Sequence, residues 1–144
     1  MLAHIASAIE ARLQGLTVFN KVERAVSGKS LSNPPTVIFR LVSDAPHAED
    51  NDQTAMASRV LSYEILIIGS ALALDHGQAG LDICIDAVRD AFHTWLPVPE
   101  GGCLPAFIGP IVLVDEVKNL LVYAGQLRLV VYPEAIKTIM RSKP

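Results

Sequence analysis

The sequence predicts an α+β fold in which a mostly antiparallel sheet of about five strands carries two helices on one face. Two segments repeat apolar residues every three or four positions, as amphipathic helices do. The other apolar segments are rich in β-branched residues, and the elements follow in the order α-β-β-β-α-β-β. Because this order favours hairpins over crossovers, we expect mainly antiparallel pairing, with both helices packed on the sheet to bury their apolar stripes.

The first helix is expected over residues 2–14, ending before Gly15. Its apolar side chains share one stripe: Leu2, Ile5, Ile9 and Leu13. Residues 17–26 then alternate with a period of two, which predicts a half-exposed strand at an edge of the sheet.

Residues 27–35 are rich in Gly, Ser, Asn and Pro and predict a turn. Residues 36–42 are apolar on both faces apart from Arg40, so we expect a strand inside the sheet. Residues 44–57 are polar and acidic, which predicts an exposed loop.

Residues 59–69 predict a strand with one apolar face, formed by Leu61, Tyr63, Ile65 and Ile67. A second helix is expected over roughly residues 78–95, ended by Pro97 and Pro99. Its stripe consists of Leu81, Cys84, Ile85, Val88, Phe92 and Trp95. After a linker, residues 107–117 and 120–132 predict a terminal hairpin, whose last strand has one apolar face: Leu121, Tyr123, Leu127, Leu129 and Val131.

The composition favours a single globular domain over residues 1–144. Hydrophobic residues make up 51% of the chain and charged residues 19%, which excludes intrinsic disorder. The net charge of −3 lacks the basic footprint of a nucleic-acid-binding protein. The longest apolar run, residues 65–74, is too short to span a membrane, and the N-terminus does not have the pattern of a signal peptide. We therefore expect a cytoplasmic protein that buries its apolar surplus in an oligomer.

Three sequence features bear on binding chemistry. Gly28-Lys29-Ser30 resembles the end of a phosphate-binding loop, but Glu23 stands where that motif needs Gly. The acidic segment lacks the Gly and the distal Glu of a calcium loop, so a solvated loop is favoured over a cation site or a loop that orders against a basic partner. Cys84 and Cys103 have no C-x-x-C spacing. We expect neither a metal nor a cofactor.

Catalytic signatures are absent from the sequence. None of the four histidines stands in a known catalytic motif: His4, His47, His76 and His93. A small cytosolic hydrolase with a histidine base remains the alternative of another class. Asp82, Asp86 and Asp90 lie on one helical face, where a solvated surface is favoured over a stripe that binds a basic partner.

Charge is distributed unevenly along the chain. Residues 1–43 hold five basic and two acidic side chains, whereas residues 44–52 hold four acidic ones. Residues 53–134 are acidic overall, and residues 135–144 hold three basic side chains. Separated charges of this kind can orient copies of a subunit or a partner.

The whole-chain pattern resembles the tail terminator proteins of long-tailed bacteriophages, also called minor tail or tail-completion proteins. The segments that carry this resemblance are, in order, LAHIASAIEARL, PPTVIFRLV, SRVLSYEILIIG, LDICIDAVRDAFHTWLP and LRLVVYP. The resemblance implies a structural protein without catalytic residues, from a phage or prophage. It would assemble in the bacterial cytoplasm into a ring, typically a hexamer, that caps the tail tube of the virion. The implied partners are the tail-tube protein and the head-completion or connector protein. Another head–tail joining or tail-tube role is the nearest alternative.

The charge segregation adds a hypothesis about which residues make the assembly contacts. We expect the basic N-terminal segment and the acidic loop to contribute to subunit or tube contacts. The candidate interface residues are Arg12, Lys21, Arg24, Lys29, Asp44, Glu49, Asp50, Asp52 and Arg128.

Overall fold

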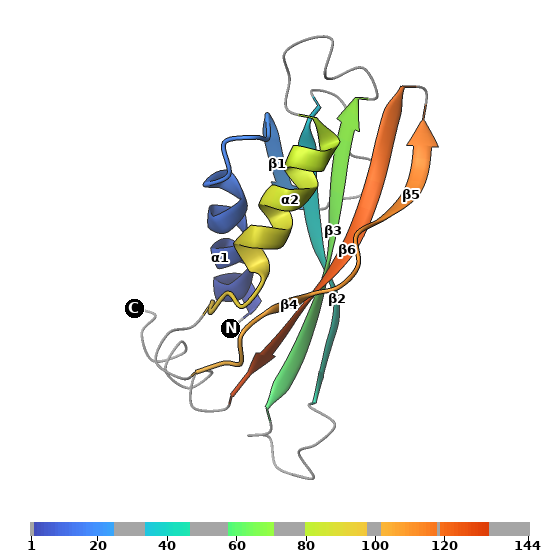
Figure 1. Cartoon of the computed structure of the whole chain (residues 1–144). Coiled ribbons are helices and arrows are strands. Elements are labelled where there is room, and N and C mark those ends of the chain that lie inside the picture. Colours follow the sequence, from blue (N-terminus) through green and yellow to red (C-terminus); the bar gives the residue numbers. More distant parts are fainter. Residues whose placement is uncertain are drawn as a thin grey trace.

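A computed structural model describes residues 2–24, 34–46, 58–70, 80–97, 102–117 and 119–132. Within this part of the chain two helices pack beside a six-stranded sheet, which confirms the predicted α+β class (Figure 1). The elements are α1 (Leu2–Gln14), β1 (Lys21–Arg24), β2 (Thr36–Pro46), β3 (Arg59–Ser70), α2 (Leu81–Phe92), β4 (Phe107–Ile108), β5 (Val112–Val117) and β6 (Leu120–Val131). No helix of the described residues is long and apolar enough to cross a membrane.

The sheet is built around three long antiparallel strands, β2, β3 and β6. Its order is β1-β2-β3-β6-β4, and β5 pairs with another part of β6. β1 pairs with β2 in parallel, so the sheet is mostly but not wholly antiparallel. Both helices lie on the same side of the sheet, as predicted (Figure 1).

The main core lies between the helices and one sheet face. The predicted apolar face of β3 is buried there, together with Leu127, Leu129 and Val131 of β6. From α1 the core takes Ile5, Ala6, Ile9 and Leu13, and from α2 it takes Cys84, Val88, Ala91 and Phe92. Leu2, assigned from sequence to the buried stripe, is instead 37% exposed because it lies at the first position of α1. A smaller cluster on the opposite sheet face contains Ile38, Ile68 and Val122.

The first half of the sheet differs from expectation in two places. The strand expected over residues 17–26 starts later, at Lys21, because residues 17–20 form a turn in which Asn20 bonds to the backbone of Pro34 and Pro35; residues 25 and 26 lie outside the described residues. Residues 44–46, expected to open a loop, instead belong to β2, which continues to Pro46 opposite Arg59, and residues 47–57 of the expected loop lie outside the described residues. Long-range pairing thus overrides the polar local sequence.

The second helix is shorter at its C-terminus than predicted, because it ends at Phe92 rather than near Trp95. Thr94 has a φ of 62°, a left-handed conformation that stops the helix before Pro97 is reached. After the helix, the Thr94 N–H donates a hydrogen bond to the Ala106 carbonyl, and the Ala106 N–H donates one to the Trp95 carbonyl. Trp95 still joins the core, with its ring edge-on to Phe92 at 5.3 Å between centroids.

The strand expected over residues 107–117 is two strands, because Gly109 and Pro110 interrupt it. Pro110 has no N–H to donate to a strand ladder. Ile111 then crosses over Gly125, where a Cβ atom would lie only 2.8 Å from Ile111 Cγ1. The glycine therefore makes room for the chain to move from β4 into β5 along the same edge of β6.

Candidate assembly surface

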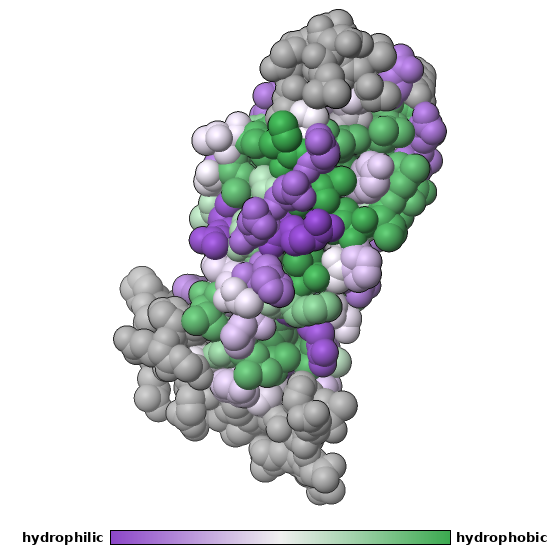
Figure 2. Space-filling view, in the orientation of Figure 1, coloured by the Kyte–Doolittle hydropathy of each residue, from purple (hydrophilic) through white to green (hydrophobic). Residues whose placement is uncertain are grey.

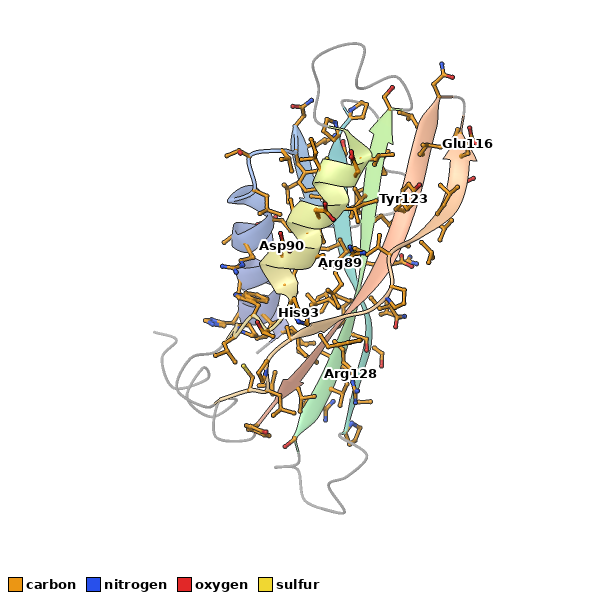
Figure 3. The ribbon with its side chains drawn as sticks, in the orientation of Figure 1. Arg89, Asp90, His93, Glu116, Tyr123 and Arg128 are labelled. Atoms are coloured by element: carbon orange, nitrogen blue, oxygen red, sulfur yellow. The ribbon has the colours of Figure 1, made fainter. Side chains whose placement is uncertain are left out.

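The charged residues proposed for assembly lie in several places instead of one patch. Arg12 lies on α1, Lys21 and Arg24 on β1, Asp44 near the end of β2, and Arg128 on β6. Figure 3 shows Arg128 well apart from Glu116, which lies on β5. The remaining candidates lie outside the described residues: Lys29, Glu49, Asp50 and Asp52. Their part in assembly stays a prediction.

Arg12 is engaged within the subunit. Its Nε donates a hydrogen bond of 2.9 Å to the carbonyl of Ala91 in the last turn of α2. The guanidinium also lies 5.8 Å from the centroid of the Trp95 ring, within cation–π range. Carbonyls in the last turn of a helix have no partner within the helix, so Arg12 satisfies one of them and joins the two helices.

Two other candidates form ion pairs within the subunit. Lys21 Nζ lies 2.7 Å from Glu23 Oε1, and Asp44 Oδ1 accepts a 2.9 Å hydrogen bond from Arg59 Nε. Arg24 stacks over the ring of Phe39 at 5.8 Å and is exposed. Arg128 is also exposed, beside Phe107 and Ser62 in the strand register. Partly exposed ion pairs stabilise a fold only weakly, so these residues can still serve contacts with another chain.

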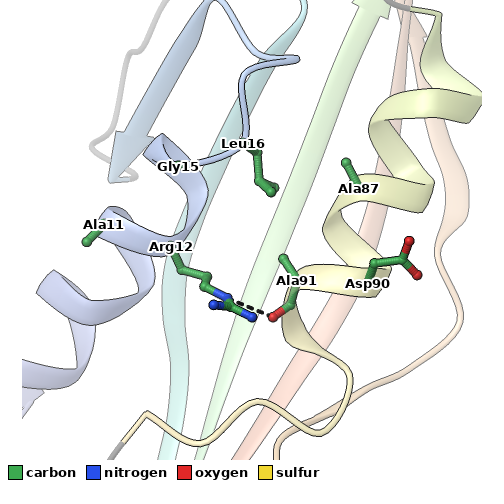
Figure 4. A pocket seen from close by; sticks show the side chains of 7 residues that line it. All are labelled: Ala11, Arg12, Gly15, Leu16, Ala87, Asp90 and Ala91. Carbon is green, nitrogen blue, oxygen red and sulfur yellow. Dashed lines mark hydrogen bonds between the residues drawn. The ribbon is translucent and has the colours of Figure 1, made fainter.

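Three cavities of the described residues are large enough to consider as a reaction site. A groove of about 500 Å³ between the helices is lined mainly by small side chains, with Arg12 and Asp90 as its charged groups (Figure 4). A pocket of about 190 Å³ lies beside α1, and another of about 390 Å³ lies where Gly109 and Pro110 interrupt the edge strand. Among the described residues, no histidine lines any of the three. His4 and His93 are exposed, and His47 and His76 lie outside the described residues.

Metal ligation and thiol chemistry have no evident site in the part of the chain that is described. It contains no group of three or more His, Cys, Asp or Glu side chains placed to hold a metal ion. Cys84 is fully buried, and burial raises the pKa of its thiol to about 11, with a smaller contribution from the Asp82 carboxylate. A thiol with this pKa stays protonated near neutral pH and is a poor nucleophile.

Strand β5 forms the most unusual surface of the described residues, and it is not among the candidate interface residues predicted from the sequence. Its residues are all exposed, and three successive apolar side chains, Val112, Leu113 and Val114, are 52%, 51% and 54% exposed. Hydrophobic surface is visible along this margin of the molecule in Figure 2. The sequence contains a signal for this surface. The three apolar residues directly precede Asp115 and Glu116, in a predicted hairpin strand against which neither predicted helix was expected to pack.

β5 is also an edge strand. It pairs with β6 on one side, and no described strand pairs with its other side. Among the described residues, the opposite edge of the sheet has a second open stretch, because β1 is described only as far as Arg24, opposite Phe39 of β2. Beyond that point Leu41 and Val42 are 40% and 51% exposed. Edge strands normally avoid exposed apolar residues because their unpaired backbone groups promote association.

These features define a two-layer α+β domain with an apolar strand at one sheet edge and an open stretch at the other. No protein-family model matches the chain, and no curated protein matches it. Among solved structures, a chain from the virion of a native gene transfer agent (GTA) particle is similar, with a TM-score of 0.53 and 19% sequence identity. The match covers 90% of this chain and 92% of that chain. At this identity the likeness shows a shared fold.

Proposed function

We propose that the protein is a structural component of a phage-like virion. The observation that carries this proposal is the fold shared with a GTA virion chain over nearly the full length of both chains. The apolar edge strand β5 supports it independently, because such a surface is suited to burial against another protein. The proposal includes no catalytic step.

Within this class, we propose the role of a tail terminator, which forms a ring of identical subunits on the end of the tail tube. The resemblance in element order supports this role. A ring also requires that one patch of a subunit meets a different patch of the next copy, and the two sheet edges are different surfaces of this kind.

Native mass spectrometry of the purified chain, followed by addition of its tail-tube protein, tests the proposal. We expect a discrete multimer near six copies, and tubes that stop growing once the multimer is added. Open-ended polymerisation of the chain alone would favour a tail-tube role. A monomer that does not bind tubes would contradict the proposal.

A further inference from the structure

We propose that strand β5 of one copy pairs with the open stretch of β2, residues 40–46, in the next copy, so that the sheet continues from subunit to subunit. This inference rests on the proposed assembly of identical copies and specifies the contact that builds it. Its occupant is a second copy of this chain, in which each subunit presents β5 at one side and accepts a neighbour's β5 at the other.

The two surfaces match in character. β5 has six residues, and the stretch of β2 from Arg40 to Pro46 has no described strand on its outer side. Both surfaces expose apolar side chains at a register shift of their ladder, which falls between Leu41 and Ser43 on β2 and between Leu113 and Asp115 on β5. Val42 and Val114 are the residues skipped at these shifts, and both are about half exposed.

The strand directions are compatible with antiparallel pairing between neighbours in a ring. Within one subunit β5 is antiparallel to β6, β6 to β3, and β3 to β2, so β5 runs opposite to β2. A rotation about an axis roughly along the strands preserves these directions, so β5 of the neighbour arrives antiparallel to β2. The two open stretches lie at opposite ends of the sheet. β5 pairs with the first residues of β6, and these align across β3 with the first residues of β2, which β1 covers. The open stretch of β2 is at its other end. Such an offset along the strands is what a closed sheet of tilted strands needs.

Charge complementarity sets the register. Asp115 lies opposite Val122 and Arg40 opposite Glu64, and the strand register places both on the sheet face away from the helices. Glu116 lies opposite Leu121 and Arg24 opposite Phe39, which are on the helix face. If Asp115 aligns with Arg40, the paired stretch ends at these two residues, because β1 already pairs with Phe39, and Glu116 lies beyond it near the end of β1, where Arg24 lies.

The charged groups of this contact can form ion pairs with the neighbouring copy. No ion-pair partner of Asp115 or Glu116 is found among the described residues. Arg40 bonds Glu64 through Nε at 2.9 Å, yet its side chain is 59% exposed. A guanidinium has five N–H donors, so a second carboxylate can bind beside Glu64. The same alignment places Leu113 beside Leu41 on the helix face, which buries two exposed leucines against each other.

Cysteine cross-linking of the full-length Leu41→Cys/Leu113→Cys variant tests this pairing. Facing residues on adjacent strands have Cβ atoms close enough for a disulfide after small adjustments. On a non-reducing gel we expect a ladder of covalent multimers that extends beyond the dimer. The matched control, Ile83→Cys/Leu113→Cys, places one cysteine on the exposed face of α2 and should give no ladder.

A charge exchange tests the register separately. We expect Asp115→Arg to weaken self-association about tenfold at low salt, and addition of Arg40→Glu to restore most of it. Far-UV circular dichroism and thermal unfolding of each variant check that the fold persists. A multimer that persists without a ladder, and that is indifferent to Asp115→Arg, overturns the strand pairing and leaves the proposed function standing. A chain that stays monomeric at high micromolar concentration overturns both.

Discussion

At the scale of single residues, Gly69 marks a place where β3 and α2 approach each other closely. A Cβ atom at this position would lie 2.6 Å from both Cγ and Cδ2 of Leu81, on the first turn of α2. Side chains that approach so closely must move, and Leu81 packs against the main core. The absence of a side chain at Gly69 therefore sets how near the helix can lie to the sheet.

We expect Gly69→Ala to destabilise the fold by about 1–3 kcal/mol, because the methyl group overpacks the space held by Leu81. The midpoint of urea unfolding measures this change. Gly109→Ala is the matched control, since a Cβ atom there would meet nothing nearer than the Gln126 carbonyl oxygen at 3.8 Å. An equal effect of the two substitutions would contradict the packing argument.

Cys84 should make the stability of the fold sensitive to alkaline pH. Burial raises the pKa of its thiol from 9.0 to about 11. Below pH 9 the thiol is protonated in both states and the contribution is fully present. Between pH 9 and pH 11 only the unfolded chain ionises, so stability is lost as the pH rises.

The expected loss from Cys84 over this range is of the order of 2 kcal/mol in the free energy of unfolding. Tyr63 acts in the same direction, because burial also raises the pKa of its hydroxyl. We therefore expect Cys84→Ala to reduce the alkaline loss without abolishing it, as measured by denaturant unfolding at pH 8 and pH 10.5. An unchanged pH profile in this variant would refute the assignment to Cys84.

At the scale of elements, the pairing of helix with helix depends on Arg12. The hydrogen bond to Ala91 and the stacking near Trp95 connect α1 to the end of α2 and the segment that follows. The local sequence marks Arg12 only as a polar residue off the apolar stripe. Its partners are 79 positions away for Ala91 and slightly farther for Trp95, so they become visible only in the folded chain.

We expect Arg12→Met to lower the free energy of unfolding by about 1–2 kcal/mol, because it removes a hydrogen bond and a cation–π contact but keeps the aliphatic stem. Thermal and urea unfolding measure the change. Arg89→Met is the control, since Arg89 lies 3.6 Å from Asp86 in an exposed pair and should contribute little. If both variants unfold alike, Arg12 does not join the helices in solution.

At the scale of the whole molecule, the sheet formed by the described residues has two dissimilar open stretches at its edges. An exposed β5 and an open stretch of β2 leave unpaired backbone groups and apolar side chains facing outward. Natural sheets usually protect such edges with charges, prolines or short strands. Here the protection is partial, with Pro110 before β5 and Pro46 at the end of β2. This pattern is typical of a surface that another chain covers.

Association should therefore be part of the stability of the protein. We expect the midpoint of thermal unfolding to rise with protein concentration, because a partner that binds only the folded chain stabilises it by mass action. Calorimetry over a hundredfold range of concentration measures the shift. In the Asp115→Arg variant the dependence should be weaker. A midpoint that does not change with concentration would show that self-association does not stabilise the chain.

The sequence by itself determined the α+β class, the bounds of α1 and the buried faces of β3 and β6. These features follow from local periodicity, since a period of two or of 3.6 residues is written into each segment. Tertiary structure decided that β1 joins β2 in parallel, that β2 extends past Asp44 to meet Arg59, and that Gly109 and Pro110 divide the last edge strand. It also decided which charges are engaged within the subunit and which apolar residues stay exposed. These outcomes depend on pairing between segments distant along the chain, and no local pattern encodes the partner.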